Sequence, residues 1–134
     1  MPVHTRTKLN ELDNLHGVVI SRCYNIMKLW GFTQSEIATV LDISTSSLRR
    51  YLANPDNVRL NRDRHDRVSY IINIHIGLTS LFSTNETIYG FIAKPNHSDF
   101  FSGRIPKQLL LEGSMENLID ITRYVQRLSE GGIL

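Results

Sequence analysis

Residues 33–52 constrain the fold more than any other part of the chain; they read TQSEIATVLDISTSSLRRYL. Thr33 and Glu36 have the spacing of a capping box, in which both side chains accept hydrogen bonds from the backbone of a helix's first turn. Asp42 interrupts the apolar periodicity, and Ser44 or Thr45 can cap a second helix. The segment therefore predicts two short helices joined by a tight turn, which is the helix-turn-helix arrangement. The positions expected to pack between them are apolar: Ile37, Ala38, Leu41, Ile43, Leu48 and Leu52.

The second helix of such a pair enters the major groove of DNA, so its first turn must be compact and polar. Hydroxyl groups donate or accept hydrogen bonds at base edges, and arginine reaches guanine or phosphate. The candidate DNA-binding residues are Gln34, Ser44, Thr45, Ser46, Ser47, Arg49 and Arg50. The alternative is a helical hairpin within a bundle, whose polar face is only solvated. This cluster of charge is small for DNA, so a homodimer is expected to double the contacts and fix the half-site spacing.

The rest of the chain also shows helical periodicity, which predicts an all-α fold. A mobile N-terminal arm is expected at residues 1–8, a helix-turn-helix domain at 9–82 and a small helical domain at 83–134. A long helix over residues 60–82 would join the two halves; its β-branched residues make a strand the competing prediction, but its length favours a helix. The alternating charges of residues 62–67 are expected on a solvated helix face.

Composition excludes several classes of protein. The net charge is only +2, which neither requires nor excludes a nucleic-acid partner. The single cysteine, Cys23, excludes a disulfide scaffold and is expected in the core. We find no apolar run of about 18 residues and no signal-peptide pattern, so a soluble cytoplasmic protein is expected. The five histidines lack metal-ligand spacing, and no nucleophile elbow or phosphate loop occurs, so no enzyme, cofactor or metal is expected.

Residues 33–52 resemble the helix-turn-helix of the phage-repressor and Xre class. In that class a glutamine early in the first helix and polar residues at the start of the second contact DNA. Matched by position, the resemblance assigns phosphate contacts to Gln34 and Ser44, with Arg49 as a further candidate. It assigns base contacts to Thr45, Ser46 and Arg50. One departure is Asp42, which stands where the class commonly has glycine; aspartate tolerates the left-handed conformation better than most residues.

Residues 84–128 are similar to the C-terminal toxin-binding domain of the Xre/MbcA/ParS antitoxin family. The segments that carry this resemblance are Phe91-Ile92, Pro95-Asn96, Gly103 to Pro106, Leu109 to Gly113 and a closing amphipathic helix. The family typically has Trp-Leu in place of Phe91-Ile92, and the loop from Asn96 to Gly103 is slightly longer here. The resemblance implies a cytosolic antitoxin that neutralises a co-encoded toxin and represses its own operon. The commonest partner in that family is a RES-domain toxin that degrades NAD.

The toxin-binding candidates are aromatic or basic residues of the second half: Phe100, Phe101, Arg104, Lys107, Arg123 and Arg127. Adjacent aromatics in a polar loop are good interface anchors, although one of the two is expected in the core. Surface Lys and Arg often confer only solubility. Two other functions stay open: a stand-alone regulator, with a ligand-sized cavity under the helix at 60–82, and an interaction adaptor without salt-dependent affinity for DNA.

Overall fold

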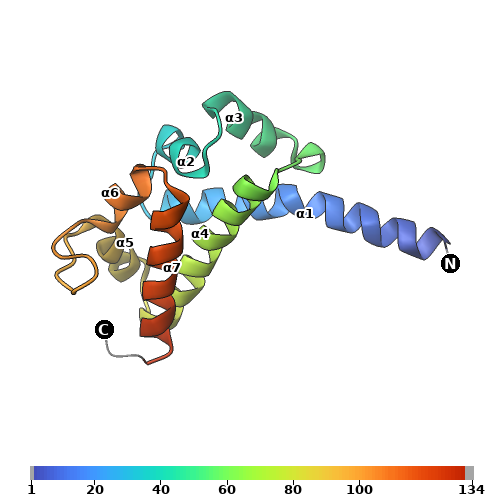
Figure 1. Cartoon of the computed structure of the whole chain (residues 1–134). Helices are drawn as coiled ribbons and strands as arrows, with labels where there is room; N and C mark the ends of the chain where they lie inside the picture. Colours follow the sequence, from blue (N-terminus) through green and yellow to red (C-terminus); the bar gives the residue numbers. More distant parts are fainter. Residues whose placement is uncertain (1, 132–134) are drawn as a thin grey trace.

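The computed structural model describes the backbone of residues 2–131 and the side chains of residues 15–131. Within these limits the chain has seven α-helices and no strand, so the all-α prediction is confirmed (Figure 1). The helices are α1 (Pro2–Leu29), α2 (Gln34–Leu41), α3 (Thr45–Ala53), α4 (Arg62–Leu81), α5 (Asn85–Ala93), α6 (Pro106–Leu111) and α7 (Met115–Ser129), with a short 3₁₀ turn, η1, at Pro55–Asn57.

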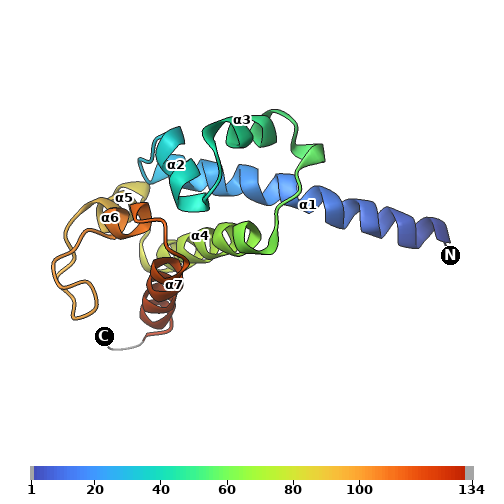
Figure 2. The ribbon, with the colours of Figure 1, turned by 45° about the horizontal axis from the view of Figure 1, so that its top comes forward.

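Helix α4 is the central element of the fold, as expected for the helix that joins the two halves. It packs against α1 and α2 and also against α7 (Figure 2). Its approach to α7 is very close at Gly77, where an added Cβ would lie 2.5 Å from Cγ1 of Val125. A side chain at this position would therefore push the two helices apart.

One hydrophobic core runs through both halves of the chain. Trp30 and Ile37 from the first half and Ile121 and Val125 from the second belong to the same buried cluster. Cys23 is fully buried in it, and burial raises the pKa of its thiol well above the ordinary value. The prediction that Cys23 is a core residue is confirmed, and the thiol stays protonated and unreactive.

The N-terminal segment differs from the expected arm. Helix α1 begins at Pro2, so residues 2–8 have helical backbone and extend α1 beyond the body of the molecule (Figures 1 and 2). Their mobility, and the boundary at residue 9, stay predictions. Met1 and the apolar tail at Ile133 and Leu134 lie outside the described residues.

Candidate functional site

Helix α2 is fixed at both ends by its own sequence. The backbone N–H of Glu36 donates to Oγ1 of Thr33 at 3.1 Å, and the N–H of Thr33 donates to Oε1 of Glu36 at 2.9 Å, so the capping box is present. The hydrogen bond from Thr33 lowers the pKa of the Glu36 carboxyl. At the other end Asp42 has φ of 56° and takes the left-handed conformation that glycine usually supplies. The tight turn between α2 and α3 therefore forms although Asp42 stands in place of the usual glycine.

Helix α3 begins with a cluster of hydroxyl groups. The backbone N–H of Ser47 donates to Oγ of Ser44 at 3.0 Å, and this hydroxyl in turn donates to Oγ of Ser47 at 2.9 Å. Ser44 is thus the N-cap of α3. Ser46 is exposed and Thr45 is half-buried, so their side chains lie at the surface of the first turn. This turn has the compact polar character that a groove-binding helix needs.

The structure brings the predicted DNA-binding residues of the two helices together. Nε of Arg49 on α3 donates to Oε1 of Gln34, the first residue of α2, at 3.1 Å. Arg50 lies beside them, with Nη2 at 3.5 Å from Oγ of Ser47 and its guanidinium 5.5 Å from the ring centroid of Tyr51. Both arginines are exposed. Polar side chains from α2 and α3 therefore share one outward surface, here called the α2–α3 surface: Gln34, Ser44, Thr45, Ser46, Ser47, Arg49 and Arg50.

The sequence analysis missed Arg67, the arginine that holds the end of α2 in place. Arg67 of α4 was expected on a solvated face, but it is only 7 % exposed. Its Nη1 donates to the carbonyl of Val40 at 3.1 Å and to that of Gly113 at 2.7 Å, and its Nε donates to Oδ1 of Asp63 at 2.8 Å. One guanidinium thus joins the end of α2 to the connection between α6 and α7.

A signal for this burial exists in the sequence. Arg67 precedes Ile71, Ile74 and Leu78 at steps of four, three and four residues, which places it on the core face of α4. Arg64 assists from the next turn, since its Nε donates to the carbonyl of Asp42 at 3.0 Å. The alternating charges therefore do not share one solvated face.

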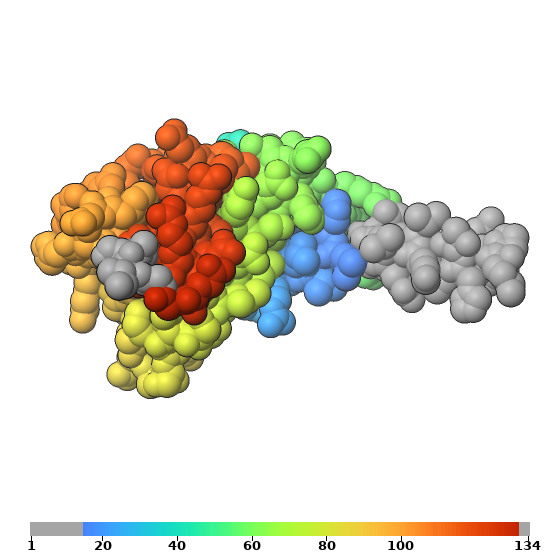
Figure 3. Space-filling model, turned by 60° about the horizontal axis from the view of Figure 1, so that its bottom comes forward, coloured from blue at the N-terminus to red at the C-terminus, as the bar shows by residue number. Residues whose placement is uncertain are grey.

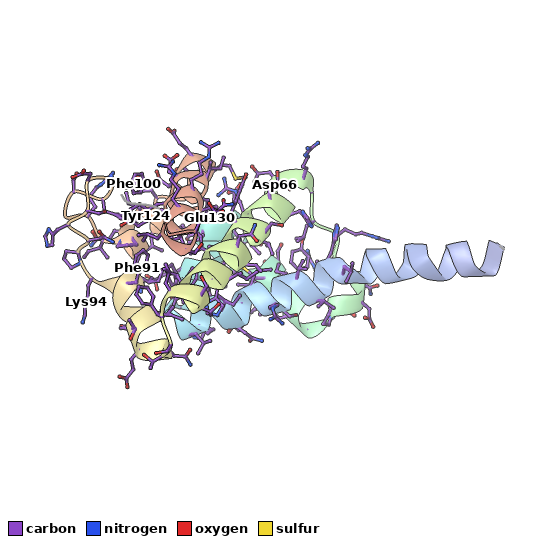
Figure 4. All side chains as sticks on the ribbon, turned by 90° about the horizontal axis from the view of Figure 1, so that it is seen from below. Asp66, Phe91, Lys94, Phe100, Tyr124 and Glu130 are labelled. Carbon is purple, nitrogen blue, oxygen red and sulfur yellow. The ribbon has the colours of Figure 1, made fainter. Side chains whose placement is uncertain are left out.

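The two adjacent phenylalanines of the second half have different environments. Phe101 is fully buried, and its ring lies edge-on to Tyr124 with centroids 4.9 Å apart. Phe100 is half-buried and stacks on Tyr124 with centroids 5.5 Å apart (Figure 4). Phe101 therefore cannot contact a partner protein, which corrects its place among the toxin-binding candidates. The expectation that one of the two belongs to the core holds.

Two of the predicted toxin-binding cations are engaged within the chain. Arg104 donates from Nε to the carbonyl of Phe101 at 2.8 Å and from Nη2 to the carbonyl of Phe100 at 2.6 Å. Lys107 donates to the carbonyl of Gly31 at 3.2 Å and lies 3.4 Å from Oε1 of Glu36. Arg104 thus fixes the loop that presents Phe100. Lys107 connects α6 to the start of the helix-turn-helix.

The remaining cations, Arg123 and Arg127, are exposed on α7. They line a cleft of about 360 Å³ between α7 and the loop at residues 94–105, and the two elements lie side by side on the face shown in Figure 3. This α7 cleft is lined by two acidic, two basic and two aromatic residues: Asp99, Phe100, Asp120, Arg123, Tyr124 and Arg127. Two acidic residues thus join the three predicted ones, Phe100, Arg123 and Arg127.

In the part of the chain that the structure describes, no three His, Cys, Asp or Glu side chains are grouped so as to hold a metal ion. No helix in that part has the length and apolar character needed to cross a membrane.

The geometry of α2, the turn at Asp42 and α3 defines a helix-turn-helix domain. Residues 25–73 match the family model described as the antitoxin Xre-like helix-turn-helix domain. The match covers α2, α3 and η1, together with the end of α1 and the first half of α4. Domains of this kind bind DNA and regulate genes, so the match supports a DNA-binding antitoxin or regulator. A comparison with curated proteins finds no match.

Proposed function

We propose that this chain is the antitoxin of a type II toxin–antitoxin pair, acting in the cytoplasm as a homodimer. It represses its own operon through the α2–α3 surface and neutralises a co-encoded toxin through its second half. The observation that carries the proposal is the helix-turn-helix domain, which matches an antitoxin family model at residues 25–73. The resemblance of residues 84–128 to a toxin-binding domain supports a RES-domain, NAD-degrading toxin as the partner.

The proposed DNA contacts follow from the exposed groups of the α2–α3 surface. Thr45, Ser46 and Arg50 would reach base edges when α3 lies in the major groove. Gln34 and Arg49 would contact a phosphate as a pair, because the side-chain amide orients the guanidinium. Ser44 would add a phosphate contact while it caps α3, because its oxygen accepts from the N–H of Ser47 and its single O–H can turn from Oγ of Ser47 to donate to a phosphate oxygen.

The decisive experiment is co-expression of this chain with the product of the adjacent gene. We expect the neighbour alone to arrest growth, and the two proteins to protect the cell and to co-purify as one complex. A neighbour that is harmless, or that does not bind this chain, would remove the antitoxin proposal. Loss of cellular NAD when the neighbour is expressed alone would identify its chemistry as that of the RES class.

DNA binding is tested by the dependence of affinity on salt. Each phosphate that the protein neutralises contributes about −0.9 to the slope of log K against log salt concentration. Affinity for the promoter region of the operon should therefore fall steeply as salt is raised, and the full complex should protect two half-sites about one helical turn apart. An affinity that does not change with salt would favour the adaptor function.

The alternative is a stand-alone regulator that responds to a small ligand. It is supported by a groove of about 310 Å³ along α4 and α7, lined mainly by polar residues that include Asn73, Ser80, Thr122 and Gln126. This function predicts that a metabolite raises the melting temperature of the isolated protein and changes its affinity for DNA. The substitution Ser80→Phe would fill the groove and abolish that response.

A further inference from the structure

The α7 cleft has a chemistry that neither the sequence comparison nor the proposed function specifies. Four of its lining residues, Asp120, Arg123, Tyr124 and Arg127, are spaced by three or four residues, so they share one face of α7. The remaining lining residues, Asp99 and Phe100, come from the loop at residues 94–105. The cleft is therefore lined by both α7 and this loop.

The floor of the cleft is aromatic and rigid. The rings of Phe100 and Tyr124 are stacked at 26°, and the buried Phe101 packs edge-on beneath both. Arg104 donates to the carbonyl groups of Phe100 and Phe101, and its guanidinium lies 5.7 Å from the ring centroid of Phe100. The loop is also closed at its neck, where the N–H of Gly103 donates to the carbonyl of Asn96 at 2.7 Å. A floor that is ordered before binding loses little conformational entropy when it is covered.

The charges of the cleft form a gradient along α7. Asp120 stands at one end and Arg127 at the other, and seven helical steps place their Cα atoms about 10 Å apart along the axis. None of the side chains of Asp99, Asp120, Arg123 and Arg127 has an ion pair or hydrogen bond to another residue of the described chain. Their charges are therefore available to a ligand.

This gradient decides what kind of ligand fits. Two carboxylates beside the aromatic floor repel a phosphate backbone, so the cleft does not extend the DNA-binding surface. A partner segment complements the cleft if it places a basic group near Asp120, an apolar side chain against the exposed part of Phe100 and an acidic group near Arg127. A volume of about 360 Å³ is at the small end of the range for binding pockets, so it suits a few side chains and not a whole domain.

We propose that the α7 cleft is the anchoring site for the toxin, and that it receives one apolar side chain flanked by a basic and an acidic residue. The proposal rests on the proposed function and specifies its protein interface. Phe100 is the central anchor, the acidic and basic ends set the direction in which the toxin segment lies, and Arg104 is a positioning residue that acts through the loop.

The test measures the affinity of full-length variants for the co-purifying toxin. Phe100→Ala should weaken binding at least 30-fold, the loss typical of a central anchor residue. The double variant Asp120→Arg/Arg127→Asp reverses the gradient but keeps the net charge, so a loss of similar size would show that charge position matters. Lys94→Glu is the control, because it changes charge at an exposed site outside the cleft, and it should change affinity less than twofold.

The outcomes separate this proposal from the proposed function. If the unmodified chain does not bind the neighbouring gene product, the antitoxin proposal fails. If it binds, but Phe100→Ala and the double variant bind equally well, the toxin docks elsewhere and the cleft proposal is overturned. Unchanged binding of the variants to promoter DNA shows that they are folded. A loss of toxin binding in such folded variants, with Lys94→Glu unaffected, supports the cleft.

Discussion

The α2–α3 surface and the α7 cleft are built in different ways. The α2–α3 surface is formed by hydroxyl, amide and guanidinium groups that project from two short helices, and capping hydrogen bonds hold these helices. The α7 cleft is hollow, and its floor is fixed by the stacking of Phe100 on Tyr124 above the core. The first surface is suited to many weak polar contacts, whereas the second is suited to one buried anchor.

The two designs predict different distributions of binding energy. Affinity for DNA accumulates over many phosphate contacts and is sensitive to salt, so no single side chain of the α2–α3 surface should dominate it. Affinity for a protein depends on a few anchors that lose their water on binding. The two surfaces should therefore respond separately to substitution.

The largest loss of stability is expected from a substitution in the core beneath the cleft. Phe101→Ala should lower the free energy of unfolding by about 3–5 kcal/mol, because it empties a fully buried aromatic site. Urea unfolding would measure the loss. The half-buried Phe100 provides the matched control, and Phe100→Ala should cost clearly less stability. Equal losses at the two positions would contradict the division between core and surface.

The next largest effect should come from the arginine that joins the two regions. Arg67→Met should lower the free energy of unfolding by about 2–3 kcal/mol, because it removes hydrogen bonds between a charged group and two carbonyl groups. The exposed Arg62→Met on the same helix should cost about 0.5 kcal/mol or less. If the two variants are equally stable, the hydrogen bonds of Arg67 to the two halves contribute nothing measurable to the free energy of unfolding.

The α2–α3 surface is tested most directly at Arg50. Arg50→Ala should weaken binding to the operator by about 1–3 kcal/mol and relax the base preference at one position, while toxin binding is unchanged. Arg123→Ala, which removes an exposed arginine from the cleft, should show the opposite pattern. A fluorescence anisotropy titration at fixed salt would give both affinities. Parallel losses in both variants would break the separation of the two surfaces.

Helix capping should give a smaller effect that is confined to stability. Thr33→Ala removes the acceptor for the N–H of Glu36 and should cost about 1 kcal/mol. Ser35→Ala, in the same turn but outside the capping box, should be nearly neutral. Thermal unfolding of the two variants makes the comparison. A neutral Thr33→Ala would show that packing alone holds α2.

The smallest expected effect is a dependence of stability on pH at the contact between α1 and α4. Nε1 of Trp30 donates to Nδ1 of His75 at 3.2 Å, so this nitrogen must be unprotonated. Burial lowers the pKa of His75 below the ordinary value of about 6.5, and the positive charge of Arg22 adds to the shift. The neutral form is therefore favoured in the native state, and its stabilisation is complete above about pH 6.5 and is lost as the pH falls through the native pKa.

The control for this prediction is His75→Asn, whose side-chain oxygen can accept from Trp30 without titrating. Unfolding free energies measured from pH 8 to pH 5 should decrease more for the unmodified chain than for the variant. Identical pH profiles would exclude His75 as the group responsible.

The sequence predicts the features that depend on neighbouring residues. The capping box at Thr33, the cap at Ser44 and the turn at Asp42 are confirmed, since each is determined within a few residues. The long helix over residues 60–82 is confirmed as α4, and the closing amphipathic helix is confirmed as α7.

Features that depend on distant contacts could not be predicted in the same way. Phe100 and Phe101 are chemically identical neighbours in a loop, and only the packing of the folded chain buries Phe101 and leaves Phe100 half-buried. Nothing in the residues around Lys107 in the sequence distinguishes it from a surface lysine. In the fold, however, its Nζ donates to the carbonyl of Gly31, which lies between α1 and α2. The two carboxylates of the α7 cleft were missed because Asp99 and Asp120 are far apart in the sequence and line the same cleft only in the folded chain.

Arg67 also limits how this protein can be re-engineered. A single guanidinium serves the carbonyl of Val40 in one half and that of Gly113 in the other, so the two halves are not interchangeable parts. A chimera that joins this first half to the second half of a relative would leave one of these carbonyls unmatched unless both parents share the same arginine geometry. Retargeting the protein to a new operator is therefore best attempted by resurfacing the exposed side of α3, with the rest of the chain transplanted as one piece.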